Sequence, residues 1–477
     1  MMDYKNYIGG TWVETQASQA NVNPSDVSDV LGHAAKSSAE LMEQAIDAAH
    51  QAAPQWAAST PQQRFDVLDF VGSEILARKE ELGRLLSREE GKTLPEGIGE
   101  AARAGQIFKF FAGEALRQAG DRLASVRPGV EIDVTRSPVG VVGMITPWNF
   151  PIAIPAWKVA PALCYGNSVV LKPAELVPGC AHALVEILSR SGLPDGVVNL
   201  VFGRGSEIGP VLVESDKVKA ISFTGSVPTG RGIAAACGQK LKKVQLEMGG
   251  KNPMVVVDDA DLNLAVDACL NGAFFSTGQR CTASSRLIVT EGIHDRFVNA
   301  LTDAMKALKV GHALEAGTQM GPVVDERQLQ QNLSYVEVAA KESGRVIGGE
   351  RLNRETEGFF MSPALVTDTD NAMRINREEV FGPVASVIRV KDYDEALAVA
   401  NDTAFGLSAG ICTTSLKLAS HFKANAEAGM VMVNLPTAGV DYHVPFGGTK
   451  GSSFGSREQG RYAAEFYTTV KTAYTLP

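Results

Sequence analysis

One cysteine of this sequence stands in a setting that suits a nucleophile. Cys281 lies in the Gly-Gln-Arg-Cys-Thr stretch, residues 278–282, directly after the apolar run 273–275. A glycine and small polar neighbours can leave a thiol accessible, and a thiolate attacks electrophilic carbon. The stretch alone is weak evidence, because most free cysteines are small buried hydrophobes.

Two other residues have the right types to assist such a thiol. Glu247 follows an apolar strand and precedes two glycines, and burial there would raise its pKa enough for a general base. Asn149 lies at a strand end in the stretch 146–151, where its amide can donate to a developing oxyanion. Simpler interpretations stay open: a solvated strand-end glutamate, and a turn asparagine before a proline.

A third feature predicts a phosphate site. The stretch 223–226, Phe-Thr-Gly-Ser, with Gly230 after it, indicates a strand-to-helix turn whose N–H groups can approach a phosphate. The G-x-G-x-x-G pattern of many dinucleotide sites is absent.

These residues sit in alternating strand and helix patterns. Between 139 and 249 we expect strands at 139–145, 168–172, 197–201, 220–223 and 244–246, and helices at 154–165, 178–191, 207–214 and 230–237. A second series starts at 253–257, with a helix at 262–275 that leads to Cys281. It continues with strands at 286–289, 385–390 and 430–433 and helices at 294–308, 326–343, 393–402 and 416–426. Nearly continuous apolar strands predict parallel sheets covered on both faces, which bind ligands at their carboxyl ends.

The segments outside these two series are also patterned. We expect a helix at 39–58, a second from Pro61 to Gly91 with Thr60 as its N-cap, and a third at 97–119. An exposed strand is expected at 131–136, and the alternating tail 466–474 is a strand of its own sheet or of a partner's.

Composition limits the class of protein. A length of 477 residues predicts two or three domains, and a net charge of -9 argues against a general nucleic-acid or anionic-membrane surface. The six cysteines are scattered without metal-ligand spacing, which predicts no metal site and a reduced, cytoplasmic setting. No signal-peptide pattern or membrane span is seen.

Taken together, the motifs resemble the aldehyde dehydrogenase superfamily. The matching stretches occur in family order over nearly the whole chain: 146–151, 172–175, 223–226, 246–251, 278–281, 378–383 and 445–448. The resemblance implies that Cys281 attacks an aldehyde, that Asn149 and the Cys281 amide hold the oxyanion, and that Glu247 activates water to hydrolyse the thioester. It also places Lys172 in the catalytic set.

The resemblance implies a nicotinamide cofactor as well. Lys172 and Glu175 match positions that hold the adenosine ribose, and a carboxylate there favours NAD, with NADP still possible. Ser226 matches a phosphate contact, and Glu379 and Phe381 match residues at the nicotinamide ribose. The remaining expected cofactor residues are Ile145, Thr146, Pro147, Trp148, Gly205, Phe223 and Gly225.

The substrate residues implied by the resemblance are Phe150, Trp157, Arg280, Thr282 and Phe446. Arg280 can pair with a substrate carboxylate or turn away to a structural partner. Trp157 stands where enzymes for dicarboxylic semialdehydes often have arginine, so part of the usual clamp is missing. The stretch 438–445 resembles α-ketoglutaric semialdehyde dehydrogenases, and we expect that substrate. A neutral aromatic or aliphatic aldehyde is the alternative.

The implied fold is α/β in three parts. Residues 1–118 and 138–248 form a Rossmann-like NAD-binding domain, 249–447 a catalytic α/β domain, and 119–137 with 448–477 a β-flap and tail that build a homodimer or homotetramer. The usual Ser-Gly-x-Gly-Arg-Glu stretch is spaced differently here, with Glu458 as the expected matching carboxylate. Two rivals are an inactive structural member of the fold and a thiol hydrolase, but no histidine lies in a motif suited to the latter.

Overall fold

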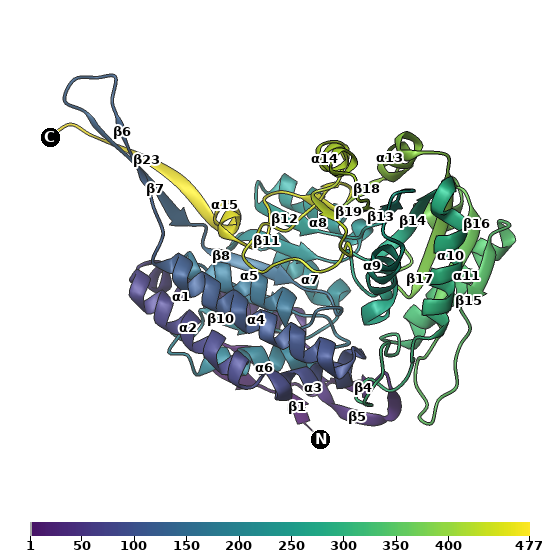
Figure 1. Cartoon of the computed structure of the whole chain (residues 1–477). Helices are drawn as coiled ribbons and strands as arrows, with labels where there is room; N and C mark the ends of the chain where they lie inside the picture. Colours follow the sequence, from purple (N-terminus) through teal and green to yellow (C-terminus); the bar gives the residue numbers. More distant parts are fainter. Residues whose placement is uncertain (1) are drawn as a thin grey trace.

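The computed structural model describes residues 2–477 and shows two α/β lobes with an arm extending from one of them (Figure 1). Each lobe is built on one large sheet, and the arm carries the C-terminal strand. The α/β fold predicted from the alternating pattern is confirmed.

The first lobe holds an eight-stranded sheet in the order β22-β12-β11-β8-β9-β10-β2-β3. Its strands are β2 Asn6–Ile8, β3 Thr11–Val13, β8 Val141–Ile145, β9 Ser168–Lys172, β10 Val198–Leu200, β11 Val218–Thr224, β12 Lys243–Glu247 and β22 Ser453–Phe454. The five strands from β12 to β10 are parallel, and Ile145 lies beside both Lys172 and Phe223. The strands therefore end together, so the motifs that follow them share one edge.

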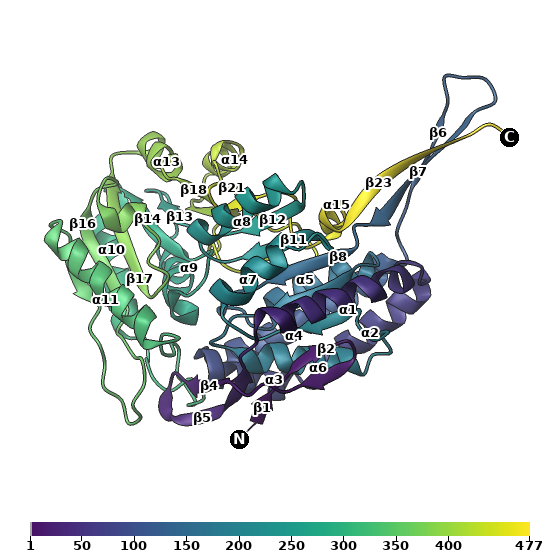
Figure 2. The same ribbon diagram turned by 180° about the vertical axis from the view of Figure 1, so that it is seen from behind.

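Helices cover both faces of this sheet. α1 Ala39–Ala57, α7 Gly205–Glu214 and α8 Val227–Gln239 lie on one face (Figure 2). α5 Ala153–Cys164 and α6 Pro178–Ser189 pack on the other, with α2 Pro61–Ala77, α3 Lys79–Glu90 and α4 Leu94–Ala115 outside them (Figure 1). The strand and helix residues between the layers are buried and apolar. Because both faces of the sheet are covered, strands β8 and β9 have nearly continuous apolar sequences.

The second lobe holds a seven-stranded sheet in the order β15-β16-β17-β14-β13-β19-β20, parallel except for β15. Its strands are β13 Asn252–Val256, β14 Ser284–Thr290, β15 Arg345–Gly348, β16 Ala364–Thr369, β17 Val384–Val390, β19 Ser408–Cys412 and β20 Met430–Val433. Its helices are α9 Leu262–Phe274, α10 Glu291–Lys306, α11 Glu326–Lys341, α12 Arg374–Arg377, α13 Tyr393–Asn401 and α14 Leu416–Asn425.

The arm is a three-stranded antiparallel sheet in the order β23-β7-β6. β6 Asp121–Ala124 and β7 Glu131–Pro138 form a hairpin, and β23 Thr468–Thr475 pairs with β7 along its whole length. The tail strand thus completes a sheet of its own chain, one of the two outcomes that its alternation allowed. Its outer face is largely exposed, and the arm stands clear of the two lobes (Figures 1 and 2).

Small elements complete the chain. A three-stranded sheet joins β1 Met2–Tyr4, β5 Asp26–Ala35 and β4 Ser18–Asn23, and a two-stranded sheet joins β18 Phe405–Gly406 and β21 Thr449–Lys450. Short helices lie at η1 Phe275–Gly278, η2 Arg461–Ala463 and α15 Ala464–Tyr467. No helix within residues 2–477 combines the length and the apolar character that crossing a membrane requires.

Several element predictions were wrong. The helix expected from Pro61 to Gly91 is two helices, because Arg78 leaves the helical conformation (φ -101°, ψ 13°), although Ile75 and Leu82 continue one buried stripe across the break. The helix expected at 97–119 begins at Leu94, where Thr93 and Glu96 form a capping box, and ends at Ala115. Strands β16 and β19 were not predicted.

The domain boundaries stay a prediction, with one departure. The sequence assigns 448–477 to a single tail, but β22 from that tail joins the edge of the first sheet beside β12. The departure arises because β12 would otherwise present an unpaired edge.

Candidate active site

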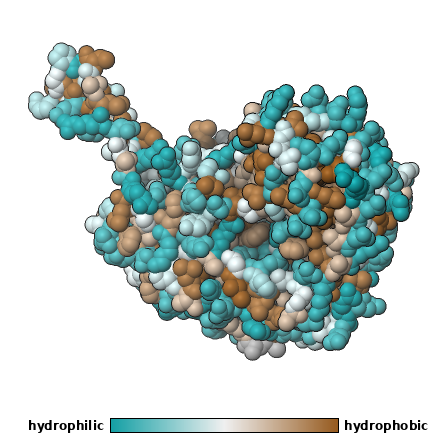
Figure 3. All heavy atoms as spheres, in the orientation of Figure 1, coloured by the Kyte–Doolittle hydropathy of each residue, from teal (hydrophilic) through white to brown (hydrophobic). Residues whose placement is uncertain are grey.

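Cys281 lies where two cavities meet. One, of about 290 Å³, is lined by residues of α4, α5 and the 438–440 loop, and the other, of about 350 Å³, lies at the carboxyl edge of the first sheet. Trp157 and Phe446 line both cavities with Cys281, and their ring centroids lie 5.3 Å apart with the planes tilted by 31°. We call them the tunnel cavity and the sheet-edge cavity. The face shown in Figure 3 is hollowed near its centre, between the two lobes.

The backbone before Cys281 is held in an unusual shape. After α9 ends at Phe274, Ser276, Thr277 and Gly278 all adopt left-handed conformations, with φ of 50°, 56° and 63°. A Cβ at Gly278 would lie 2.1 Å from the Gly382 carbonyl oxygen, so no other residue fits there. This geometry turns the chain away from the axis of α9 and places Cys281 between the two lobes.

Burial and charge keep the Cys281 thiol protonated in this state. Burial, then the Glu379 and Glu247 carboxylates, raise the pKa of Cys281 to about 12. The backbone N–H groups of Cys281 and Thr282 face the sulfur and lower that pKa. The same two N–H groups lie where an oxyanion would form on a carbon bound to the sulfur.

The Asn149 amide is placed beside this loop. Its Nδ2 donates a 3.0 Å hydrogen bond to the Gln279 backbone carbonyl, two residues before the cysteine. The backbone carbonyl of Asn149 accepts a bond from Lys92 Nζ. The side chain is buried and lines the sheet-edge cavity with Cys281. One amide hydrogen uses the Gln279 bond, which leaves the second for another acceptor.

Glu247 lines the same cavity at the end of β12. It is buried, and its pKa is raised well above the ordinary value by burial and by the nearby Glu458 carboxylate. Ser453 Oγ donates a 2.5 Å hydrogen bond to Glu247 Oε2, which lowers the pKa in part. A carboxyl group with a raised pKa can exchange a proton with water near neutral pH.

Glu458, the carboxylate expected to match the C-terminal motif, is buried beside the site. Lys158 Nζ donates to its Oε1 and to Ser222 Oγ, so the charge is paired. Its backbone forms an antiparallel bridge with Phe446, with N···O distances of 2.7 and 2.9 Å. Glu458 therefore holds the aromatic wall of both cavities as well as acting on the pKa of Glu247.

Half of the expected cofactor residues line the sheet-edge cavity. These are Pro147, Trp148, Gly225, Ser226, Glu379 and Phe381. Trp148 packs edge-on against Phe381, 5.3 Å away. Glu379 accepts a 2.8 Å hydrogen bond from the Gly250 N–H, and burial raises its pKa to about 7.

The other six lie along the same sheet edge but outside this cavity. Glu175 Oε1 accepts a 2.8 Å bond from the Gly205 N–H, and Lys172 Nζ lies 3.9 Å from the same carboxylate. Ile145 and Phe223 are neighbouring strand ends, and the Thr146 N–H donates to the Lys172 carbonyl. Lys172 lines neither cavity at Cys281, so the structure does not bring it to the other residues of the expected catalytic set.

This edge fits a dinucleotide chemically. Within residues 2–477 the buried hydroxyls of Thr146 and Thr224 have no hydrogen-bond partner. The Ser226 hydroxyl does not cap α8, so the first-turn amides of that helix lack a side-chain acceptor and can meet a phosphate.

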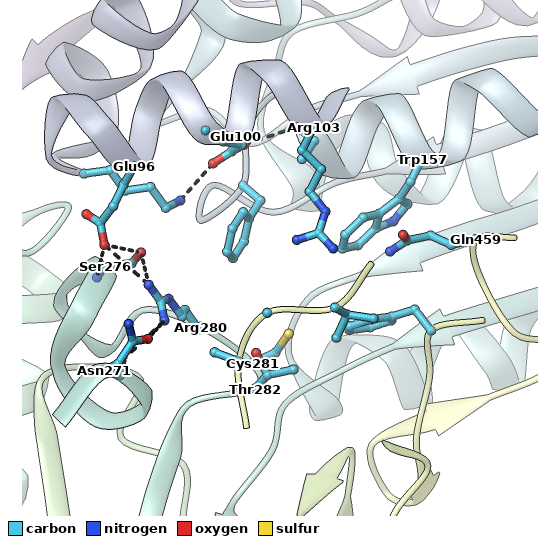
Figure 4. A pocket seen from close by; sticks show the side chains of 18 residues that line it. Glu96, Glu100, Arg103, Trp157, Asn271, Ser276, Arg280, Cys281, Thr282 and Gln459 are labelled. Carbon is cyan, nitrogen blue, oxygen red and sulfur yellow. Dashed lines mark hydrogen bonds and ion pairs between the residues drawn. The ribbon is translucent and has the colours of Figure 1, made fainter. Parts of the chain in front are cut away.

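All five expected substrate residues line the tunnel cavity: Phe150, Trp157, Arg280, Thr282 and Phe446 (Figure 4). Arg280 combines the two alternatives, a position facing the substrate and a structural partner within the protein. It lines the cavity, yet it also donates 2.9 Å to Ser276 Oγ and lies 3.4 Å from Glu96 Oε1. Its charge is therefore matched within the protein.

Sequence reasoning missed seven polar residues of the tunnel cavity: Lys92, Glu96, Glu100, Arg103, Asn271, Ser276 and Gln459. Glu96 and Arg103 lie seven positions apart on α4 and share a face, which helical spacing could have revealed. Lys92 and Gln459 reach the cavity from loops, and nothing in their local sequence marks them.

Comparison with known proteins gives a consistent answer. Residues 12–473 match the aldehyde dehydrogenase family. An α-ketoglutaric semialdehyde dehydrogenase of Bacillus subtilis is 44% identical, over 99% of this chain and 98% of that protein. An α-ketoglutarate semialdehyde dehydrogenase of Haloferax volcanii is 43% identical, over 98% of each. A crystal structure of betaine aldehyde dehydrogenase from Staphylococcus aureus with NAD+ superposes with a TM-score of 0.96 at 36% identity, over 99% of this chain and 95% of that one.

The chain belongs to the aldehyde dehydrogenase family. It is an aldehyde-oxidising oxidoreductase, as its motifs predicted.

Proposed function

We propose that this protein oxidises α-ketoglutaric semialdehyde to α-ketoglutarate with NAD, using Cys281 as the nucleophile. The observation that carries the proposal is the position of Cys281 between a cation-lined tunnel cavity and a sheet-edge cavity that holds Glu247 and Asn149. Two relatives named for this substrate are 43 and 44% identical over nearly the whole chain.

The chemistry starts at the sulfur. After losing its proton, Cys281 Sγ attacks the aldehyde carbon and forms a thiohemiacetal. The oxyanion is stabilised by the free Asn149 amide hydrogen and by the N–H groups that face the sulfur. All three donors are fixed by the fold before substrate arrives, so little reorganisation is needed.

The second half of the reaction needs a cofactor and a base. When bound, NAD supplies the acceptor for the hydride that leaves the substrate carbon. The thioester that remains on Cys281 is hydrolysed by a water from which Glu247 takes a proton. The Ser453 hydrogen bond stabilises the charged form of Glu247 that this step requires.

The residues proposed to hold NAD follow the sheet edge. Ser226 and the first turn of α8 would face the pyrophosphate, and Glu379 with Phe381 would face the nicotinamide ribose. Glu175 would accept from the adenosine 2′-hydroxyl and repel a 2′-phosphate, with Lys172 beside it. NAD is therefore the proposed cofactor over NADP.

Two further parts of the proposal concern assembly and setting. The arm carries exposed apolar side chains, Leu123, Val126, Val470 and Tyr474, and we propose that it pairs subunits in a homodimer or homotetramer. Light scattering that gives a monomer mass at micromolar concentration would reject this.

All six cysteines are unpaired, which supports a reducing, cytoplasmic setting.

The decisive experiment follows NADH absorbance with a panel of carboxylated, aromatic and aliphatic aldehydes. We expect the highest kcat/KM on α-ketoglutaric semialdehyde. Glu247→Gln is expected to give a single-turnover burst of NADH and then stop, because hydride leaves before hydrolysis. Normal steady turnover by Glu247→Gln would reject Glu247 as the base, and activity without nicotinamide would point to a thiol hydrolase.

A further inference from the structure

The tunnel cavity carries three side-chain N–H donors without an acceptor among residues 2–477. They are Arg103 Nε on α4, Trp157 Nε1 on α5, and Gln459 Nε2 in the segment after β22. All three atoms are buried, and in Figure 4 the Arg103 guanidinium extends from α4 into the cavity. Buried donors are normally satisfied, so three unpartnered donors on residues that line one cavity point to a ligand with acceptor atoms.

Arg103 differs from the other cations of this cavity. Lys92 Nζ lies 3.0 Å from Glu100 Oε2, and Arg280 lies 3.4 Å from Glu96 Oε1. Arg103 has no carboxylate within 4.0 Å in the described part of the chain, and Glu100 and Asp441 act on it from farther away. An anion can therefore bind Arg103 without breaking an existing ion pair, whereas Arg280 is already committed.

Gln459 combines an unsatisfied buried side-chain amide with a strained backbone conformation. Its side chain is buried, neither amide atom has a partner among residues 2–477, and its backbone has a φ of 59°. The preceding residue is fixed by the Glu458–Phe446 bridge, so the amide cannot turn away easily. A strained residue with an unsatisfied buried amide is typical of a binding position.

We propose that Arg103, Trp157 and Gln459 bind the 2-oxo acid end of the substrate, with Arg103 on the carboxylate and the other two donors on the keto oxygen. The proposal rests on the function proposed above. It names the residues that bind the end of the substrate opposite the aldehyde. Guanidinium binds carboxylate in a bidentate manner, and single N–H donors suit a carbonyl oxygen. It assigns to Arg103 the role that the sequence suggested for Arg280.

Three five-carbon aldehydes separate the contributions. α-Ketoglutaric semialdehyde has both groups, glutaric semialdehyde replaces the keto carbon by a methylene, and pentanal has neither group. Arg103→Met is expected to lower kcat/KM on both anionic substrates by about ten- to one-hundredfold relative to its effect on pentanal. Gln459→Met and Trp157→Phe should each lower kcat/KM on the keto substrate about three- to tenfold more than on glutaric semialdehyde or pentanal.

Controls keep each outcome decisive. Arg117→Met, an exposed arginine paired with Glu114 just beyond α4, should leave all three substrates unchanged. Equal losses on pentanal and the anionic substrates in Arg103→Met would overturn the assignment. So would an anion-selective loss in Arg280→Met that exceeds that of Arg103→Met.

A binding measurement covers variants that turn over too slowly. α-Ketoglutarate should inhibit the wild type more strongly than glutarate. Gln459→Met should abolish that difference, whereas Arg103→Met should weaken inhibition by both acids. An unchanged preference in Gln459→Met, or unchanged inhibition by both acids in Arg103→Met, would reject the proposal. A wild type that prefers pentanal to both anionic aldehydes would instead reject the proposed substrate class, and the two failures are thus distinguishable.

Discussion

Ser453 Oγ donates a 2.5 Å hydrogen bond to Glu247 Oε2, because the antiparallel register of β22 and β12 puts the two residues opposite each other. The bond favours the charged carboxylate and opposes the effect of burial and of Glu458 on its pKa. A residue from the last tenth of the chain thus tunes the proposed base.

Removal of this bond should shift the pH dependence. In Ser453→Ala the pKa of Glu247 rises further, so a base that must be unprotonated becomes active only at higher pH. The acidic limb of the kcat profile is expected to move upward by about one pH unit, equivalent to a ~1.4 kcal/mol bond. Ser453→Thr keeps the hydroxyl and should restore the limb; a profile identical in Ala and wild type would contradict this role.

The reactivity of the Cys281 thiol should depend on Glu379. That carboxylate is the leading charge among the causes that raise the cysteine pKa to about 12. In Glu379→Gln the pKa falls, the thiolate fraction at a given pH increases, and iodoacetamide should alkylate Cys281 several-fold faster. The rate is measured by peptide mass spectrometry at several pH values.

A neighbouring carboxylate provides the control. Glu378 pairs with Arg374 and Tyr335 at the surface, so Glu378→Gln should leave the alkylation rate unchanged. Equal acceleration in both variants would show a general loosening of the segment instead of a charge effect.

Asn149→Ala should slow the first chemical step. An oxyanion donor is typically worth about 10²–10³ in kcat, and the loss is expected in the NADH burst itself. The melting temperature should fall too, since the bond to the Gln279 carbonyl disappears. A burst of normal rate followed by slow turnover would assign Asn149 to hydrolysis.

Gly249 leaves room for Glu379. A Cβ there would lie 2.0 Å from Glu379 Oε2, so Gly249→Ala must displace that carboxylate. We expect a raised KM for NAD of about tenfold or more, a factor worth ~1.4 kcal/mol. Gly232→Ala, a helix position with open space, should keep KM unchanged and stabilise the protein slightly.

The local sequence determined much of the fold, because apolar runs and helix caps act through neighbouring residues. Apolar runs such as β8 and β9 are buried on both faces, and Thr60 with Pro61 starts α2 by capping its first turn. The break at Arg78 escaped detection because the buried stripe continues through it.

The sequence by itself also determined the family and the expected site residues, through motifs whose chemistry needs fixed types at fixed positions. Tertiary structure decided what those positions face. Arg280 is neutralised by Glu96 from α4, and Arg103 Nε is left without a hydrogen-bond partner among residues 2–477. Ion pairing and burial depend on segments that are far apart in the chain, so the charge that remains free for substrate was invisible until the chain was folded.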